Sequence, residues 1–90
     1  MIKLFKTKTN KTEKKIRIMN NITIIANHIY RNGNNQYYID KIYDYIRELK
    51  SLGYRATEVK STVKSALLQS LLNDNEAIFI LRTYRNLWTI

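Results

Sequence analysis

One amphipathic stretch in the middle of the chain restricts the fold more than any other feature of the sequence. Apolar side chains recur in it at the i, i+3, i+4, i+7 and i+10 spacing of one helix face, and these are Ile39, Ile42, Tyr43, Ile46 and Leu49. Gly53 follows the last turn, where a left-handed residue often ends a helix. Such a helix is stable in water only when other elements cover its stripe. The remainder of this 90-residue chain must therefore form a small packed domain around it.

The chain before this helix predicts another helix at residues 16–31. Its stripe recurs at spacings of four, three and four residues and consists of Ile18, Ile22, Ile25 and Ile29, flanked by Met19, Ala26 and Tyr30. Isoleucine lowers helix propensity, so a strand over part of this segment is the alternative. The run NGNN at 32–35 ends the pattern, because Gly33 and asparagine tolerate positive φ. Gln36 and Tyr37 would then form a strand of one or two residues.

A third helix is predicted at residues 57–72, with Thr57 as its N-cap and Glu58 favourably placed in its first turn. At 100° per residue, its core face consists of Val59, Val63, Ala66, Leu67, Ser70 and Leu71. Its outer face consists of Ser61, Lys64, Ser65, Leu68 and Leu72. The run NDN at 73–75 would end this helix.

The C-terminal run EAIFILRTYRNLWTI predicts a β-hairpin, because it is dense in residues that favour strands. Its strands would be Ala77–Arg82 and Leu87–Ile90, joined by a turn at Thr83–Asn86. Three helices followed by a two-stranded ribbon are the element order of a winged helix. We therefore expect a mainly α fold with a small β-ribbon, a winged helix-turn-helix with a C-terminal β-hairpin wing.

Three segments of the sequence resemble the HARE-HTH type of winged helix, a group related to the delta subunit of bacterial RNA polymerase. They are NGNNQYYIDKIYDYI, GYRATEVKSTVKSALLQSLLNDN and AIFILRTYRNLWTI. Gly33, the run from Thr62 to Leu67 and Trp88 fit the pattern of that group, whereas its proline after the first helix and its wing glycine are missing. The resemblance implies a winged helix that contacts DNA or docks on another protein.

Positive charge is concentrated at the start of the chain. The formal net charge is +9, and residues 1–20 contain seven basic residues and one acidic residue. Such an excess favours a polyanionic partner, most often nucleic acid. A low-GC coding bias is an alternative source of part of the excess, though not of its uneven placement. We expect residues 1–15 to be a basic flexible arm and residues 16–90 to be the winged-helix domain.

The sequence offers little to a catalytic or metal site. Its one histidine, His28, lies inside a predicted helix, and the chain has no cysteine. Asp40 and Asp44 have the spacing of one helix face and could share a metal ion, but such a pair is most often solvated surface. Phosphate-binding loops, nucleophile elbows and zinc signatures do not occur. We therefore predict a protein that is not an enzyme and has no cofactor.

A winged helix would bring the basic elements of this chain onto double-stranded DNA in one docking arrangement. The DNA-contacting residues would be Arg55, Thr57, Lys60, Ser61, Lys64 and Ser65 around the helix at 57–72, Tyr84 and Arg85 in the wing, and Lys6, Lys8, Lys11, Lys14 and Lys15 in the arm. The predicted function is a small transcription regulator of phage, plasmid or low-GC bacterial origin, with the helix at 57–72 as its recognition helix. RNA is a further alternative, since basic arms and tyrosines suit it as well.

Apolar side chains on the predicted outer faces indicate a second kind of partner. Leu68 and Leu72 on the third helix and Ile78 and Ile80 on the ribbon would form a patch typical of a protein interface. A homodimer, the N-terminal segment or a host protein would cover it. The alternative function is therefore protein docking, for example by a phage-encoded inhibitor of a host polymerase or nuclease.

The sequence shows no signal of secretion or membrane insertion. Its isoleucine-rich run NITIIANHIY has about ten residues, whereas about 20 are needed to span a bilayer. The first residues also lack the apolar core of a signal peptide. We expect a cytoplasmic protein, in the host cytoplasm if it is viral.

Overall fold

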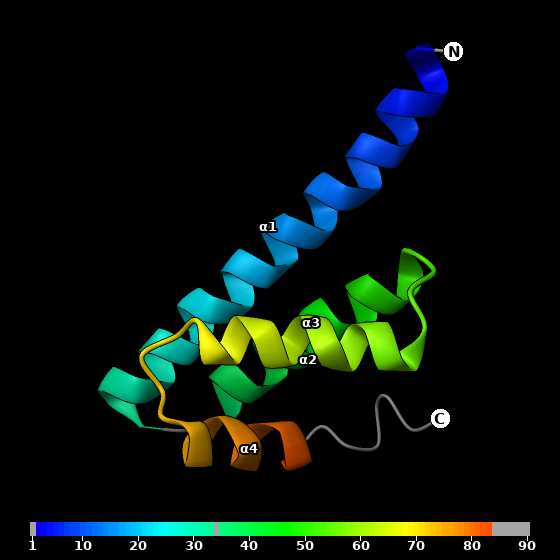
Figure 1. Cartoon of the computed structure of the whole chain (residues 1–90). Coiled ribbons are helices and arrows are strands. Elements are labelled where there is room, and N and C mark those ends of the chain that lie inside the picture. The colour runs from blue at the N-terminus through cyan, green and yellow to red at the C-terminus, as the bar shows by residue number, and fades with distance from the viewer. Residues whose placement is uncertain (1, 34, 84–90) are drawn as a thin grey trace.

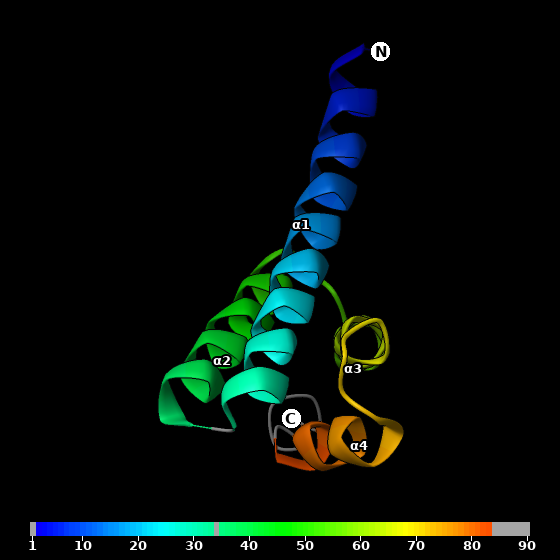
Figure 2. The same ribbon diagram turned by 90° about the vertical axis from the view of Figure 1, so that its left-hand side faces the viewer.

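Four helices make up the structure, a computed structural model that describes residues 2–33 and 35–83, with side chains from Lys11 onward. They are α1 (Ile2–Asn32), α2 (Gln36–Ser51), α3 (Ala56–Leu68) and α4 (Asp74–Thr83). The short loop between α1 and α2 makes these two helices antiparallel neighbours, and α3 packs against both (Figure 1). α4 packs against α3 and lies at the end of the molecule where α1 and α2 are joined (Figure 2).

The three predicted helical stripes all enter one hydrophobic core. Its buried residues are Ile18, Ile22, Ala26 and Ile29 from α1, Ile42, Ile46 and Leu49 from α2, Val59, Val63, Ala66 and Leu67 from α3, and Leu72, Ala77, Ile80 and Leu81 from α4 and the loop before it. Thr62 is also buried. Its hydroxyl donates to the carbonyl of Glu58 (2.8 Å), so it does not need a hydrogen bond from water. The periodicity in the sequence therefore identified the core of these helices, except at the end of the third, where Ser70 and Leu71 were assigned to the core face but are not buried.

Two glycines adopt the left-handed conformation at the positions where the sequence predicts helix ends. Gly33 has φ +82° after α1, and Gly53 has φ +94° after α2. The predicted strand at Gln36–Tyr37 is wrong, since both residues lie in the first turn of α2. The side chain of Asn35 caps this turn by accepting from the backbone N–H groups of Tyr37 (2.9 Å) and Tyr38 (3.3 Å).

The prediction of a winged helix is wrong, because the described residues contain no strand. The segment Ala77–Arg82, expected to be the first strand of the wing, is helical and belongs to α4. Ala77, Ile80 and Leu81 are buried and Ile78 and Phe79 are exposed, which is the 3.6-residue period of a helix. The expected second strand, Leu87–Ile90, and most of the expected turn lie outside the described residues.

A reciprocal cap begins α4 and explains why a strand does not form there. The backbone N–H of Glu76 donates to Asn73 Oδ1 (2.8 Å), and the backbone N–H of Asn73 donates to Glu76 Oε1 (3.1 Å). This is a capping box, which satisfies two N–H groups that would otherwise lack partners at the helix start. The run NDN at 73–75, expected only to end the previous helix, therefore starts the next one.

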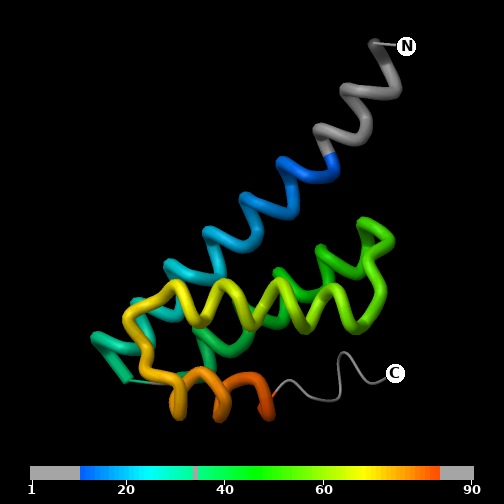
Figure 3. Tube along the Cα trace, in the orientation of Figure 1, coloured from blue at the N-terminus to red at the C-terminus, as the bar shows by residue number. Residues whose placement is uncertain are grey.

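α3 is shorter than predicted at its C-terminal end. It ends at Leu68, and the loop that follows turns past the C-terminal part of α1 (Figure 3). In this loop the backbone N–H of Leu71 donates to Asn27 Oδ1 of α1 (2.8 Å). Because the helix has already ended, Leu72 is buried, although it was assigned to the outer face, and Leu71 is half exposed, although it was assigned to the core face.

The N-terminal segment also differs from expectation. α1 is one helix from Ile2 to Asn32, so the segment expected to be a flexible arm at residues 1–15 is helical from Ile2 on. Lys11 of α1 contacts Tyr54 in the turn between α2 and α3, and the part of α1 before this lysine extends beyond the turn (Figure 1). Among the residues that the structure describes, no helix combines the length and the apolar character needed to cross a membrane.

Candidate nucleic-acid interface

The positive charge of the chain belongs mainly to one helix. α1 contains eight basic residues and one acidic residue, whereas α2 contains three of each and α4 has one basic and two acidic residues. α3 adds two lysines and one glutamate. A polyanion would therefore be attracted first to the α1 side of the molecule.

The face of α1 that enters the core changes from apolar to basic toward the N-terminus. Ile22 and Ile18 are fully buried, and the next positions on the same face, three and seven residues earlier, are Lys15 and Lys11. This change occurs where α1 passes the turn between α2 and α3. The two lysines consequently point toward that turn rather than away from the molecule.

Both lysines meet one aromatic ring in the turn. Lys11 Nζ lies 4.5 Å from the ring centroid of Tyr54, and Lys15 Nζ lies 5.3 Å from the same centroid. These are cation–π distances, and Tyr54 itself is half-buried against the core. Arg55, which follows Tyr54 directly, is exposed. We refer to Lys11, Lys15, Tyr54 and Arg55 as the Tyr54 cluster.

No carboxylate neutralises the Tyr54 cluster within the described part of the chain. The ion pair found there joins Arg47 Nη1 and Asp44 Oδ1 on α2 (3.6 Å). Glu58 lies near Arg55, but its Oε1 accepts from the backbone N–H of Arg55 (3.2 Å), as in a capping box at the start of α3. The cluster therefore presents three cationic groups from two segments that lie about 40 residues apart in the sequence.

The predicted recognition helix has a polar outer face that begins next to the Tyr54 cluster. Thr57, Lys60, Ser61 and Lys64 are exposed, and Ser65 is half-buried. Thr57 is not the N-cap, because α3 begins at Ala56 and Arg55 precedes it in an extended conformation (φ −74°, ψ 162°). The face ends at Leu68, which is 52% exposed, so its last turn is apolar rather than basic.

The structure brings together only part of the predicted DNA-contacting set. Lys11 and Lys15 meet the turn before α3, whereas Lys14 is exposed on α1. Lys6 and Lys8 lie on α1, but their side chains fall outside the described part. Tyr84 and Arg85, expected at the wing tip, are likewise outside the described residues.

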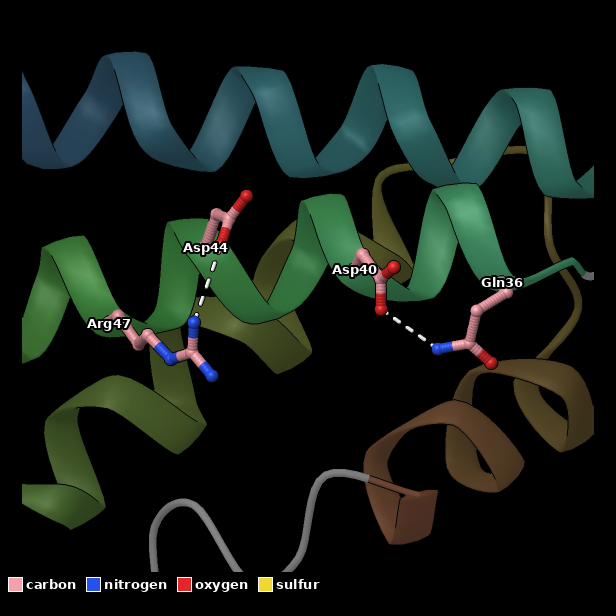
Figure 4. A network of polar contacts seen from close by, with 4 residues as sticks. All are labelled: Gln36, Asp40, Asp44 and Arg47. Carbon is pink, nitrogen blue, oxygen red and sulfur yellow. Dashed lines mark hydrogen bonds and ion pairs between the residues drawn. The ribbon is translucent and has the colours of Figure 1, made fainter.

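Asp40 and Asp44 lie on the exposed side of α2 (Figure 4). Gln36 Nε2 donates to Asp40 Oδ1 (2.8 Å), and Arg47 pairs with Asp44. Both carboxylates considered as a metal pair thus already have partners. No group of three or more His, Cys, Asp or Glu side chains suited to a metal ion occurs among the described residues.

The apolar patch predicted from the sequence is divided by the fold. Leu68 and Ile78 are about half exposed (52% and 47%), whereas Leu72 and Ile80 are buried (6% and 5%). Leu72 and Ile80 instead help to line an open groove of about 400 Å³ between the C-terminal end of α1 and α4. Tyr30 and Phe79, which are 55% and 65% exposed, also line this groove.

Sequence reasoning missed Tyr54 and Phe79. A signal for Tyr54 was present in the sequence. Lys11 and Lys15 continue the helix face of Ile18 and Ile22, so a contact with a residue at the end of the core could have been expected. Phe79 lies inside the segment Ala77–Arg82, which was predicted to be a strand, and gave no such signal. The chain matches no protein-family model, and no curated protein and no solved structure matches it significantly.

Proposed function

We propose that this protein binds double-stranded DNA through the basic side of α1, the Tyr54 cluster and the adjoining polar face of α3. The observation that carries the proposal is the convergence of Lys11 and Lys15 on Tyr54, directly before α3. It joins the most basic segment of the chain to the exposed face that begins at Thr57. Basic side chains gathered in this way support binding to phosphates.

The dimensions of the helices favour a duplex over other polyanions. An α-helix with its side chains is about 10–12 Å wide, and the major groove of B-DNA is about 12 Å wide. The part of α1 before Lys11 extends beyond the other helices, so no other described element blocks its approach to such a groove (Figure 1). Lysine, serine and threonine on α3 can donate to base edges, and a role in transcription regulation is consistent with such contacts.

The proposal is tested by measuring DNA binding as a function of salt. Fluorescence anisotropy with a labelled duplex of random sequence should show an affinity that falls linearly with salt on logarithmic axes, with a slope of about −0.9 for each phosphate contacted. Replacing Lys60 and Lys64 together by Ala should weaken binding by about 1–3 kcal/mol if either lysine contacts a base. Absence of binding at low salt would refute the proposal.

A second candidate function, docking on another protein, is favoured by the groove beside α4. Phe79 and Tyr30 expose large aromatic surfaces there, above the buried side chains of Leu72 and Ile80. Aromatic residues are enriched in protein interfaces. A partner captured from nuclease-treated lysate by the wild-type chain but lost with Phe79→Glu, while DNA binding is unchanged, would support docking. Equal capture by both chains would count against it.

A further inference from the structure

We infer that Tyr54 is a positioning residue that holds Lys11 and Lys15 together for contact with the phosphates of one DNA strand. The inference rests on the proposed DNA-binding function and adds to it the place where the backbone is bound. The Tyr54 cluster, rather than the wing expected from the sequence, would then be the main backbone contact of the protein.

The first argument is the arrangement of like charges. Both ammonium groups lie over the same ring, so the two Nζ atoms are no farther apart than the sum of their distances to its centroid, 4.5 Å and 5.3 Å. Lys11 and Lys15 are four residues apart on α1, so the helix makes them neighbours, and their like charges repel each other. The negative face of the Tyr54 ring offsets this repulsion and draws both ammonium groups to one side of the turn.

The second argument concerns the entropy of binding. A lysine side chain has four flexible carbons, and immobilising it on a ligand lowers the affinity that its charge would otherwise contribute. Lys11 and Lys15 are already confined by the ring in the free protein. Binding of a phosphate consequently costs less side-chain entropy than it would with two unconfined lysines, and the affinity is higher.

The third argument is that the cluster can accept an anion without rearranging the fold. Gly53 has no side chain, and a Cβ at this position would lie 3.9 Å from Lys11 Nζ, so the backbone here leaves the ammonium group uncrowded. Arg55, the next residue in the chain, is exposed and adds a third cationic side chain, and no carboxylate forms an ion pair with any of the three in the described residues. A cation–π contact at a half-buried ring is weaker than a charge-assisted hydrogen bond to phosphate, so the lysines can turn from the ring to an oxyanion.

Matched double variants test whether the cluster contacts phosphates. The test pair is Lys11→Gln with Lys15→Gln. The control pair is Lys41→Gln with Arg82→Gln, which removes the same charge from α2 and α4, and Lys41 also lies over an aromatic ring, that of Tyr37 (5.5 Å). Affinity for a labelled random-sequence duplex is measured by fluorescence anisotropy over a range of salt concentrations. The test pair should lower the magnitude of the salt slope by about 2, one unit for each lost phosphate contact, and the control pair should leave it nearly unchanged.

Two substitutions at the ring test whether Tyr54 positions the lysines. Tyr54→Phe keeps the aromatic face and should retain the wild-type affinity within about twofold, whereas Tyr54→Leu keeps an apolar side chain without that face and should weaken binding by roughly three- to tenfold. Thermal unfolding of each variant shows whether it is folded at the assay temperature. If Tyr54→Leu is unfolded at that temperature, Tyr54→Met takes its place as the apolar variant without an aromatic face, and the same loss of affinity is expected.

The outcomes separate the two proposals. Wild-type binding with equal salt slopes for the test and control pairs would overturn the inference and leave the DNA-binding function standing. A reduced slope for the lysine pair together with unchanged affinity for Tyr54→Leu would overturn the positioning role of Tyr54. No wild-type binding at low salt would refute the DNA-binding function itself, and with it the inference.

Discussion

Replacing Thr23 by Val should destabilise the protein, because the Thr23 hydroxyl satisfies a carbonyl at the end of a different helix. Thr23 Oγ1 of α1 donates to the carbonyl oxygen of Ala66 in α3 (2.9 Å) and lies 3.1 Å from the carbonyl oxygen of Met19. The last four carbonyls of a helix lack partners within the helix. Near this end, the N–H of Ser70 donates to the carbonyl of Leu67 instead of that of Ala66 (3.1 Å).

The expected loss of stability follows from the burial of the Ala66 carbonyl. Ala66 is 0% exposed, so water cannot replace the lost hydroxyl, and a buried carbonyl left without a partner costs about 1–3 kcal/mol. Valine has nearly the same shape and the same β-branching, so packing and helix propensity change little. For a domain of this size, the midpoint of thermal unfolding should fall by roughly 4–20 °C.

Thr62→Val is the matched control. Thr62 is also buried and its Oγ1 also donates to a carbonyl, that of Glu58 (2.8 Å), but this carbonyl lies inside α3 and can accept the helical N–H of Thr62 as well. Its free energy of unfolding should change by less than about 0.5 kcal/mol. Urea denaturation followed by circular dichroism measures both variants. Equal losses for the two variants, or no loss for Thr23→Val, would refute the reasoning.

Two further substitutions test the helix ends. Asn73→Ala should remove the cap of α4 and lower the free energy of unfolding by about 1 kcal/mol, whereas Asn75→Ala, in the first turn of the same helix, removes no cap and should not. Equal losses for the two variants would contradict the cap. Gly53→Ala should cost about 1–2 kcal/mol from backbone strain alone, since φ is +94° and a new Cβ would meet nothing closer than 3.9 Å. An unchanged unfolding midpoint for Gly53→Ala would contradict the left-handed conformation assigned to this residue.

The failure of the wing prediction has a specific cause. The run of five apolar residues from Ala77 to Leu81 can fit both the two-residue period of a strand and the 3.6-residue period of a helix, so local pattern alone does not separate them. Isoleucine and phenylalanine favoured the strand. The cap formed by Asn73 and Glu76 favoured the helix, and burial of Ala77, Ile80 and Leu81 against the rest of the core decided between them.

The candidate site was predictable in its composition but not in its assembly. The excess of lysine near the N-terminus, and the polar face of the helix after Gly53, can be read directly from the residues. That Lys11 and Lys15 reach Tyr54 depends on α1 continuing as a helix past the core, because only a helix keeps these lysines on the face of Ile18 and Ile22. The pairing also spans about 40 residues of sequence, a separation over which local periodicity carries no information.

The local sequence pattern was thus sufficient to predict three helices, most of their buried residues and the two left-handed glycines. Side-chain periodicity and backbone freedom are properties of short segments. The tertiary structure alone decided the rest: that the fourth element is a helix, that Leu72 and Ile80 are covered while Leu68 and Ile78 are not, and that one tyrosine gathers two lysines. Each of these depends on which surfaces meet after folding, and burial against a distant segment outweighs a weak local preference.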